Sequence, residues 1–341
     1  MSAALQARGE WAGALASDSG TLLGAIRGFD ARSGTSATPL GADDAEQPRR
    51  PPVDAGATAL AWRGVSWAPR RDARLAIESV DLEAHRGEIL ALVGVSGSGK
   101  STLLHLAAGI RQPTRGAVWR DRAEGRGADA LLALEYPERQ LFARSVEEDV
   151  AAMLWIEGVP REERTRRAAQ ALARLGLSPE KFAERIPSTL SEGEKRRAAL
   201  AAFLIEPPLA LLLDEPTAGL DPGGRRALRL ALEGLRASGR AVVLASHDLD
   251  FVSATADRVV VIGREADGPG GVLGSGSPET VFSDLALLER AGLPEPDFLP
   301  ITAALRARGF LAGAGPIRDG ESLLAALAAV RETLTGNAAS G

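Results

Sequence analysis

Residues 94–101 read Gly94-Val95-Ser96-Gly97-Ser98-Gly99-Lys100-Ser101, between an apolar run at 89–93 and a helix-compatible run at 102–108. A strand, a glycine-rich loop and a helix in this order are typical of a phosphate-binding loop, or P-loop. The glycines let backbone N–H groups curl around an anion, and the helix N-terminus adds partial positive charge. We therefore expect Gly94 through Thr102 to contact nucleotide phosphates, with Lys100 at the β- and γ-phosphates and Ser101 on Mg²⁺.

Lysine is rare in this chain, which makes the lysine of the P-loop informative. Lysine and arginine together number 40, but the lysines are only Lys100, Lys181 and Lys195. A compact ammonium fits beside phosphates where a planar guanidinium would not. The residue type at position 100 therefore supports binding of ATP or GTP.

The bulk composition excludes several classes of protein. The 341 residues admit one large α/β domain with extensions, and the net charge of −5 gives no basic field to attract nucleic acid. The absence of cysteine excludes disulfides, cysteine-ligated zinc and iron–sulfur clusters. No apolar run of about 18 residues and no secretory signal is visible. We therefore expect any membrane role to depend on partner subunits.

The chain divides into three predicted parts: a low-complexity, disordered tail at 1–57, a nucleotide-binding domain at 58–284 and a helical extension at 285–341. Two strands of a small antiparallel subdomain precede the P-loop, and a helical subdomain follows it. Apolar strands alternating with helices then predict an α/β fold with a mostly parallel core sheet. The predicted strands are 59–67, 75–82, 116–120, 130–134, 209–213, 241–245 and 259–262. The predicted helices are 146–157, 161–175, 192–205, 224–237 and 249–256, with short helices in 278–341.

A second motif lies at the end of an apolar strand, where Leu209-Ala210-Leu211-Leu212-Leu213 is followed by Asp214-Glu215. An acid at the tip of such a strand, beside a P-loop, can hold Mg²⁺ through water, which predicts this role for Asp214. Glu215 can orient or deprotonate the attacking water. An acid pair can also cap a helix, but the neighbouring P-loop favours the nucleotide role.

Three motifs in a fixed order resemble those of ATP-binding cassette ATPases, which are P-loop enzymes. Residues 214–221 (DEPTAGLD) resemble the Walker B motif and D-loop, and residues 190–197 (LSEGEKRR) resemble the signature helix. Ser246-His247-Asp248 resembles the switch histidine segment. The resemblance covers residues 58–284 and implies a helical signature subdomain.

The resemblance also implies roles across a pair of cassettes that face head to tail around ATP. Ser191, Gly193 and Asp221 are expected to contact the nucleotide across the interface. His247 is expected to contact the γ-phosphate and to position water with Glu215, unless it is a core or capping histidine. Together with Lys100, these two side chains form the predicted catalytic set.

A narrower resemblance concerns the ATPases of energy-coupling factor transporters, which include cobalt, nickel and vitamin importers. It rests on residues 134–142 (LEYPERQLF) and 145–150 (SVEEDV), which in that family line a groove for a coupling helix of the membrane subunit. Leu141 and Phe142 are expected either to supply apolar surface there or to pack in the core. Residues 276–282 and 288–305 resemble the C-terminal extension through which those ATPases pair.

Three positions depart from the family pattern. Glu135 replaces the Q-loop glutamine, and its carboxylate can ligate Mg²⁺ but cannot donate a hydrogen bond when ionised. Glu192 replaces a signature glycine and adds negative charge near a γ-phosphate. Pro69 occupies the expected position of the aromatic that stacks on adenine, which leaves Trp67 as a substitute or as a core residue. Glu135 and Glu192 favour pairing with a different cassette ATPase, as a heterodimer, over a homodimer.

We interpret the chain as the ATP-hydrolysing subunit of an energy-coupling factor importer for a vitamin or a transition-metal ion. ATP and Mg²⁺ are the expected ligands. The expected partners are a second cassette ATPase, a transmembrane coupling subunit and a substrate-binding membrane subunit, at the cytoplasmic face of the membrane and without nucleic acid. The alternatives are a soluble cassette ATPase in repair, translation or regulation, and the ATPase of a conventional transporter. The single cassette and negative charge disfavour the first, and residues 136–142 with the tail disfavour the second.

Overall fold

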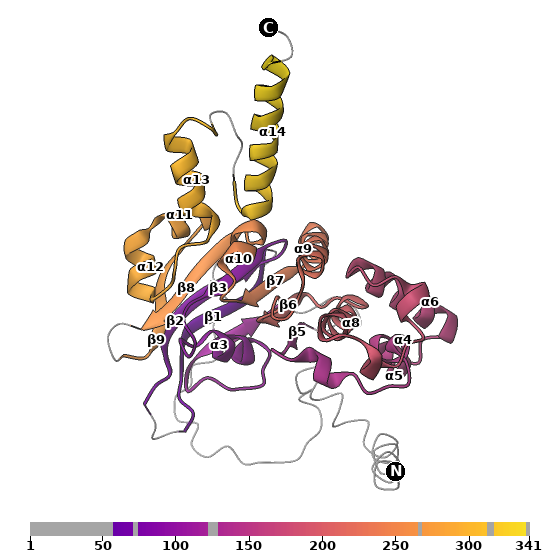
Figure 1. The fold of residues 1–341 in the computed structure, drawn as a ribbon. Coiled ribbons are helices and arrows are strands. Elements are labelled where there is room, and N and C mark those ends of the chain that lie inside the picture. Colours follow the sequence, from indigo (N-terminus) through magenta and orange to yellow (C-terminus); the bar gives the residue numbers. More distant parts are fainter. Residues whose placement is uncertain (1–56, 71–73, 122–128, 265–267, 312–316, 339–341) are drawn as a thin grey trace.

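The computed structural model describes residues 57–70, 74–121, 129–264, 268–311 and 317–338, and a nine-stranded sheet with helices on both faces forms its body (Figure 1). The predicted disordered tail lies outside these residues except for Ala57. The strands are β1 (Thr58–Trp67), β2 (Ile77–His85), β3 (Ile89–Val93), β4 (Arg115–Arg120), β5 (Ala130–Ala133), β6 (Ala210–Asp214), β7 (Ala241–Ala245), β8 (Arg258–Arg264) and β9 (Gly270–Gly276).

The helices fall into three groups along the chain. The P-loop is followed by α3 (Lys100–Ala107). The helical subdomain contains η1 (Pro137–Gln140), α4 (Val146–Val150), α5 (Ala152–Ile156), α6 (Arg161–Arg174), α7 (Pro179–Phe182), η2 (Pro187–Thr189) and α8 (Glu192–Leu204). The remaining helices are α9 (Pro222–Ala237), α10 (Leu249–Thr255), α11 (Pro278–Ser283), α12 (Leu285–Ala291), α13 (Phe298–Ala307) and α14 (Gly320–Ala338).

The central strands form the predicted parallel sheet. The strand order is β4-β1-β2-β9-β8-β3-β7-β6-β5, and the neighbours from β8 through β5 pair in parallel. Alternate residues of β3 enter opposite layers of the core, with Ile89, Ala91 and Val93 on one face and Leu90 and Leu92 on the other. A parallel strand covered on both faces must be apolar throughout, which is why the pattern predicted this part of the fold correctly.

The antiparallel strands belong to the same sheet as the parallel strands. β1 pairs antiparallel with β2, as predicted, and also with β4, and β2 joins β9 in parallel through Ile77 and Gly270. β9 is not among the predicted strands, because its sequence GGVLGSG is poor in strand-forming residues. Gly274 permits close packing there, since a Cβ atom at this position would lie 2.7 Å from Leu287 Cδ2 in α12.

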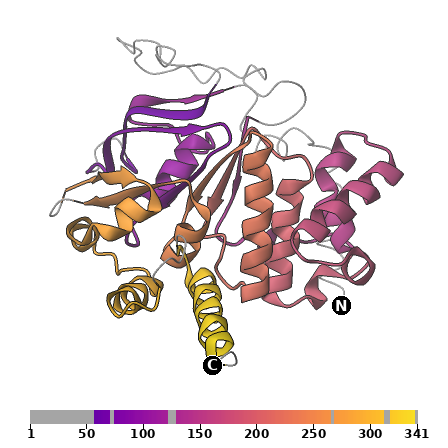
Figure 2. The ribbon, with the colours of Figure 1, turned by 90° about the horizontal axis from the view of Figure 1, so that it is seen from above.

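The helical subdomain gathers at one side of the sheet, and Figure 2 shows it beside α9. The single helix predicted over 146–157 is wrong, because the structure has two short helices, α4 and α5. Ala151 separates them with φ −88° and ψ 4°. No proline or glycine stands at this point to signal a break, so the helical pattern continued through it.

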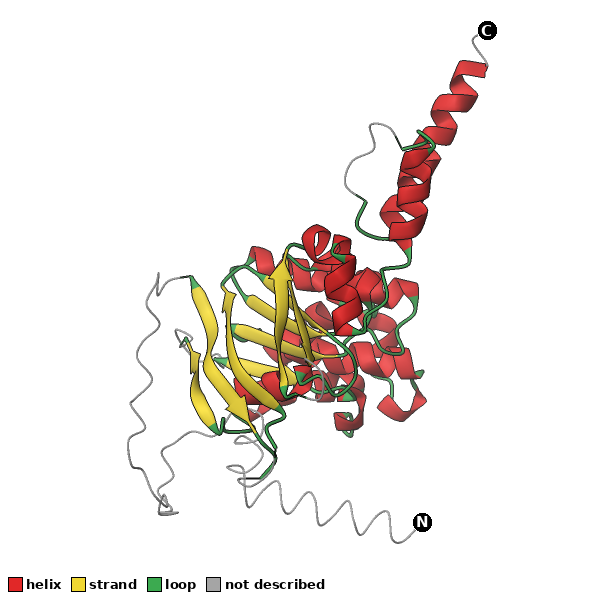
Figure 3. Cartoon of the chain, turned by 90° about the vertical axis from the view of Figure 1, so that its left-hand side faces the viewer, coloured by secondary structure: helices red, strands yellow, loops and turns green. Residues whose placement is uncertain are grey.

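The C-terminal segment packs in two ways. Buried residues of α11 and α12, among them Phe282 and Leu288, belong to the main core, whereas Phe298, Leu311 and Leu323 form a small cluster of their own. Three of the helices are short, as predicted, but α14 has 19 residues. Figure 3 shows α14 projecting away from the body of the protein.

Gly94 lies where the P-loop passes β8 most closely, which leads to a prediction about stability. A Cβ atom at Gly94 would lie 2.0 Å from the carbonyl oxygen of Ile262. We expect Gly94→Ala to lower the free energy of unfolding by about 3 kcal/mol or more, because backbone atoms must move apart. Gly97→Ala is the matched control: its φ is also positive, at 77°, but a Cβ atom there meets nothing within 4 Å.

The control should cost only about 1 kcal/mol, for the left-handed backbone alone. Urea unfolding of both variants measures the difference. Equal losses in the two variants would contradict the proposed clash at Ile262.

Candidate nucleotide-hydrolysis site

The P-loop joins the end of β3 to the start of α3, as the sequence predicts. Gly94, Gly97 and Gly99 have φ values of 156°, 77° and 115°, which favour glycine over other residues. Arg264 at the end of β8 holds the loop from outside, because its Nη2 donates to Gly97 O at 3.0 Å. The loop therefore presents backbone N–H groups at the beginning of a helix, an arrangement suited to phosphate.

Lys100 lies back over the loop that precedes it. Its ammonium donates to Gly94 O at 2.7 Å and to Val95 O at 3.1 Å, and the residue is buried. Burial lowers the pKa of Lys100, and the nearby carboxylates of Glu215 and Asp214 oppose that shift. The cation thus stands between the P-loop and the acid pair.

Asp214 ends β6 and faces the start of α3. Parallel strands carry their C-terminal ends to one edge of the sheet, which brings this acid to the P-loop. Burial raises the pKa of Asp214, whereas a hydrogen bond with the Ser101 side chain and the charge of Lys100 lower it. Hydroxyl, carboxylate and ammonium are therefore grouped at one point, as predicted from two separate stretches of sequence.

Glu215 and His247 meet across the ends of β6 and β7. His247 Nδ1 lies 2.8 Å from Glu215 Oε2, and the His247 backbone N–H donates to the same oxygen at 3.3 Å. Glu215 has φ +48°, and its own N–H donates to Ala245 O at 2.9 Å. The imidazole is largely exposed, so His247 is not a core histidine. A carboxylate in this setting can accept a proton from water that the imidazole helps to orient.

The three residues predicted to hold Mg²⁺ differ in their surroundings. The Ser101 hydroxyl lies close enough to Asp214 to lower the pKa of that carboxyl, which fits an ion that binds one or two carboxylates together with phosphate and water. Glu135 is exposed and hydrogen-bonds Tyr136, although its charge reaches Asp214. Within the described residues, no three His, Asp or Glu side chains are grouped as a metal cage. Mg²⁺ would thus depend on Ser101, Asp214 and the bound phosphates.

The signature residues form a separate group. Ser191 caps α8 by accepting from Glu194 N at 3.3 Å, and Glu194 Oε2 accepts from Ser191 N at 2.8 Å. A Cβ atom at Gly193 would lie 3.2 Å from Gly219 O in the D-loop. Asp221 caps α9 by accepting from Gly224 N at 2.6 Å. The hydrogen bonds of Ser191 and Asp221 serve the local helices, and a role of Ser191, Gly193 and Asp221 toward nucleotide stays a prediction.

Two further side chains bear on the sequence-based expectations. Trp67 packs against the core, and the Arg111 guanidinium lies 4.5 Å from the centre of its ring. The exposed Glu192 pairs with Lys195 at 2.6 Å. Arg196 is not among the predicted site residues, but it is buried and donates to the backbone carbonyl of Glu215. Its spacing from Leu200 and Leu204 could have identified it, because the three residues share one face of α8 and residues on such a face are usually apolar.

Comparisons with known proteins agree with this geometry. Residues 77–218 match the ABC transporter family. The chain is 38% identical over 270 residues to energy-coupling factor transporter ATP-binding protein EcfA2 of Symbiobacterium thermophilum, covering 76% of this chain and 90% of the relative. It is 35% identical over 245 residues to the EcfA2 protein of Clostridium tetani, covering 69% and 83%.

Solved structures show the same fold. One is CbiO1 from Clostridium perfringens, described as part of the ABC transporter complex CbiONQ, with 30% identity and a TM-score of 0.59 over 74% of this chain and 99% of that one. Another is a dimeric ATP-binding cassette bound to ADP and phosphate after hydrolysis, with 26% identity and a TM-score of 0.54 over 64% and 98%. The chain is therefore an ATPase of the ATP-binding cassette family and belongs to its energy-coupling factor transporter group.

Proposed function

We propose that this chain hydrolyses ATP as the nucleotide-binding subunit of an energy-coupling factor importer, which takes up a vitamin or a transition-metal ion. The observation that carries the hydrolytic role is the 2.8 Å contact between Glu215 and His247 beside Lys100 and Asp214. The transport role is supported by the relatives, which are named as transporter ATP-binding proteins, and by CbiO1, which is part of a transporter complex.

The arrangement supports a division of labour in hydrolysis. Lys100 and the P-loop amides bind and orient the phosphates, and they neutralise charge that grows on the oxygens between the β- and γ-phosphorus atoms. Glu215 accepts a proton from the attacking water, and His247 holds that water and the γ-phosphate in position. Ser101 and Asp214 would hold Mg²⁺, which supplies further charge compensation when bound. ATP is thereby converted to ADP and phosphate.

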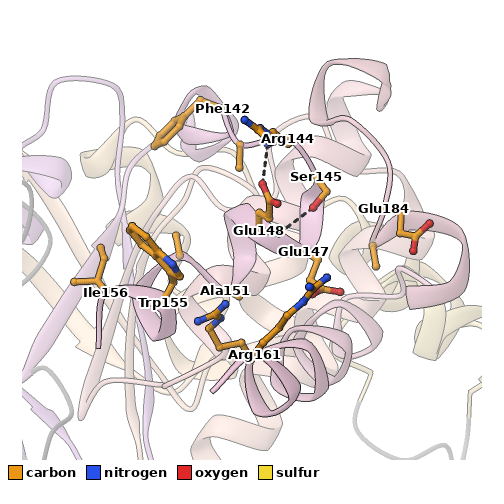
Figure 4. Close-up of a pocket in the computed structure, with 14 residues that line it drawn as sticks. Phe142, Arg144, Ser145, Glu147, Glu148, Ala151, Trp155, Ile156, Arg161 and Glu184 are labelled. Carbon is orange, nitrogen blue, oxygen red and sulfur yellow. Dashed lines mark hydrogen bonds between the residues drawn. The ribbon is translucent and has the colours of Figure 1, made fainter. Parts of the chain in front are cut away.

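A groove on the helical subdomain is the proposed contact with the transmembrane subunit. It encloses about 670 Å³, and Figure 4 shows Phe142, Trp155 and Ile156 along it with Glu148 and Arg161 nearby. Phe142 and Trp155 are 73% and 64% exposed. Large aromatic side chains exposed in a groove are favoured anchors for a partner, and an apolar helix face of the coupling subunit fits them. Leu141, by contrast, packs against the core.

Substitution of a groove aromatic tests this contact. We expect Trp155→Asp to reduce recovery of the transmembrane subunit in a pull-down by about tenfold or more, because a carboxylate cannot enter an apolar interface unpaired. ATP hydrolysis by the isolated chain should not change, since Trp155 lies outside the nucleotide site. Leu230→Asp is the control, because Leu230 is also an exposed apolar residue (55%) but lies on α9. Equal recovery with the two variants would argue against the groove.

The proposed assembly contains a second cassette ATPase, a transmembrane coupling subunit and a substrate-binding membrane subunit. The exposed Glu192 at the start of α8 supports a heterodimer, since its charge disfavours a γ-phosphate on a facing identical site. The exposed apolar residues Ile301, Phe310 and Leu324 support the C-terminal extension as a dimerisation element. Within the described segments, no helix has both the length and the apolarity to cross a membrane. We propose attachment at the cytoplasmic face through these partners.

A pull-down of the tagged chain from detergent-solubilised membranes tests the importer assignment, with partners identified by mass spectrometry. A polytopic subunit, a second cassette ATPase and a small membrane protein are the expected partners, and the last of these identifies the cargo. Recovery with ribosomes or DNA alone would contradict a role in transport.

A further inference from the structure

Arg196 is the charged residue that α8 turns toward the interior of the protein. The residue is 4% exposed and shares its helix face with the buried Leu200 and Leu204. Burial lowers the pKa of Arg196, and the negative charges of Glu138, Glu135 and Glu215 oppose this shift. A guanidinium removed from water is retained only where partners compensate for its lost hydration. The contacts of Arg196 therefore indicate what role this buried guanidinium has.

The first partner is the turn that carries the general base. Arg196 Nη2 donates to the backbone carbonyl of Glu215, which also accepts from Ala218 N at 3.3 Å. Glu215 adopts φ +48°, an unfavourable conformation for a residue with a side chain, so the turn needs support from its surroundings. Arg196 supports it from one side, and the hydrogen bond from Glu215 N to Ala245 O supports it from the other.

The second partner is Glu138 in η1. Arg196 Nη1 lies 3.7 Å from Glu138 Oε2, which is within ion-pair reach but longer than the N–H···O distance of about 2.9 Å. Arg196 Nε and Glu138 Oε2 are both buried without a hydrogen-bond partner. The pair thus has unused donors and an unused acceptor, and a shift of η1 by about 1 Å toward α8 would complete a hydrogen bond.

The helix η1, which carries Glu138, lies between the groove and Glu135 along the chain. The short helix ends at Gln140, two residues before the exposed Phe142 of the groove, and it begins two residues after Glu135. Arg196 consequently links a segment next to the groove with the backbone of the residue that faces His247. We propose that Arg196 is a positioning residue for hydrolysis, which holds the Glu215 turn and ties it to η1. This inference rests on ATP hydrolysis by the chain and is independent of its assignment to an importer.

The test compares ATP turnover with ATP binding in the full-length chain. We expect Arg196→Gln to lower kcat by about tenfold or more, because small displacements of a general base are costly, while KM and the Kd for a fluorescent ATP analogue change by less than about twofold. Arg196→Lys keeps the charge but cannot reach both partners, so it should restore only part of the rate. Glu138→Gln should lower kcat with KM unchanged, and its effect should not add to that of Arg196→Gln.

Arg167→Gln is the matched control. Arg167 also pairs with glutamates in the helical subdomain, Glu163 and Glu206, but it has no contact with the Glu215 turn, and we expect its kcat to equal the wild-type value. Thermal unfolding of every variant separates lost folding from lost turnover. An unchanged kcat in Arg196→Gln would overturn the proposal. Parallel losses of ATP binding and turnover in Arg196→Lys and Glu138→Gln would also overturn it, because they indicate a general structural role.

Discussion

Glu215→Gln is expected to lower the rate of ATP hydrolysis by about 100-fold or more, the usual contribution of a general base. The amide has almost the shape of the carboxylate, and its oxygen can still accept the backbone N–H of His247. It cannot accept a proton from water at neutral pH. The phosphate contacts come from the P-loop and Lys100, so the Kd for ATP should stay within about twofold. ATP-bound dimers should therefore accumulate.

Phosphate release measures turnover, and size-exclusion chromatography with ATP measures dimer formation. Glu162→Gln makes the same chemical change on the exposed surface of α6 and should leave both quantities unaltered. Turnover at the wild-type rate in Glu215→Gln would show that another group activates the water.

Lys100→Ala is expected to weaken ATP binding by about 100-fold or more. A charge-assisted hydrogen bond to phosphate contributes up to about 3 kcal/mol, and each 1.4 kcal/mol corresponds to tenfold in Kd. The acids Asp214 and Glu215 would lose their neighbouring cation as well, so their repulsion of the phosphates would be uncompensated. Equilibrium titration with a fluorescent ATP analogue measures the change in Kd.

Lys181 provides a matched control, because it is one of only two other lysines in the chain. Lys181→Ala removes an ammonium from the exposed surface of α7, and we expect its Kd for ATP to equal the wild-type value. An unchanged Kd in Lys100→Ala would contradict the assignment of Lys100 to the phosphates.

The fold and the candidate hydrolysis site were predictable where short stretches of sequence carry their own structural signal. The run 89–93 is apolar because β3 is covered on both faces, and the adjoining loop needs glycine for its backbone. Asp214 and Ser101 meet because both stand at the same edge of a parallel sheet. These signals are local, so no knowledge of distant contacts was required.

Other features depend on contacts between distant residues. β9 forms from a glycine-rich stretch, where α12 packs closely on Gly274. The helix α4 ends before Ala151 without a helix-breaking residue. The contacts of Arg196 with Glu138 and with the backbone of Glu215 are formed between residues far apart in the sequence. Tertiary packing determines such features, and local residue preferences do not reveal them.

The backbone conformation of Glu215 also bears on the evolution of this chain. A left-handed φ in a residue with a Cβ atom costs about 1 kcal/mol, which glycine would avoid. A glycine at this position would thus favour folding and remove the proton acceptor in the same step. Selection for thermal robustness alone would discard this glutamate, so its retention requires continued selection for turnover.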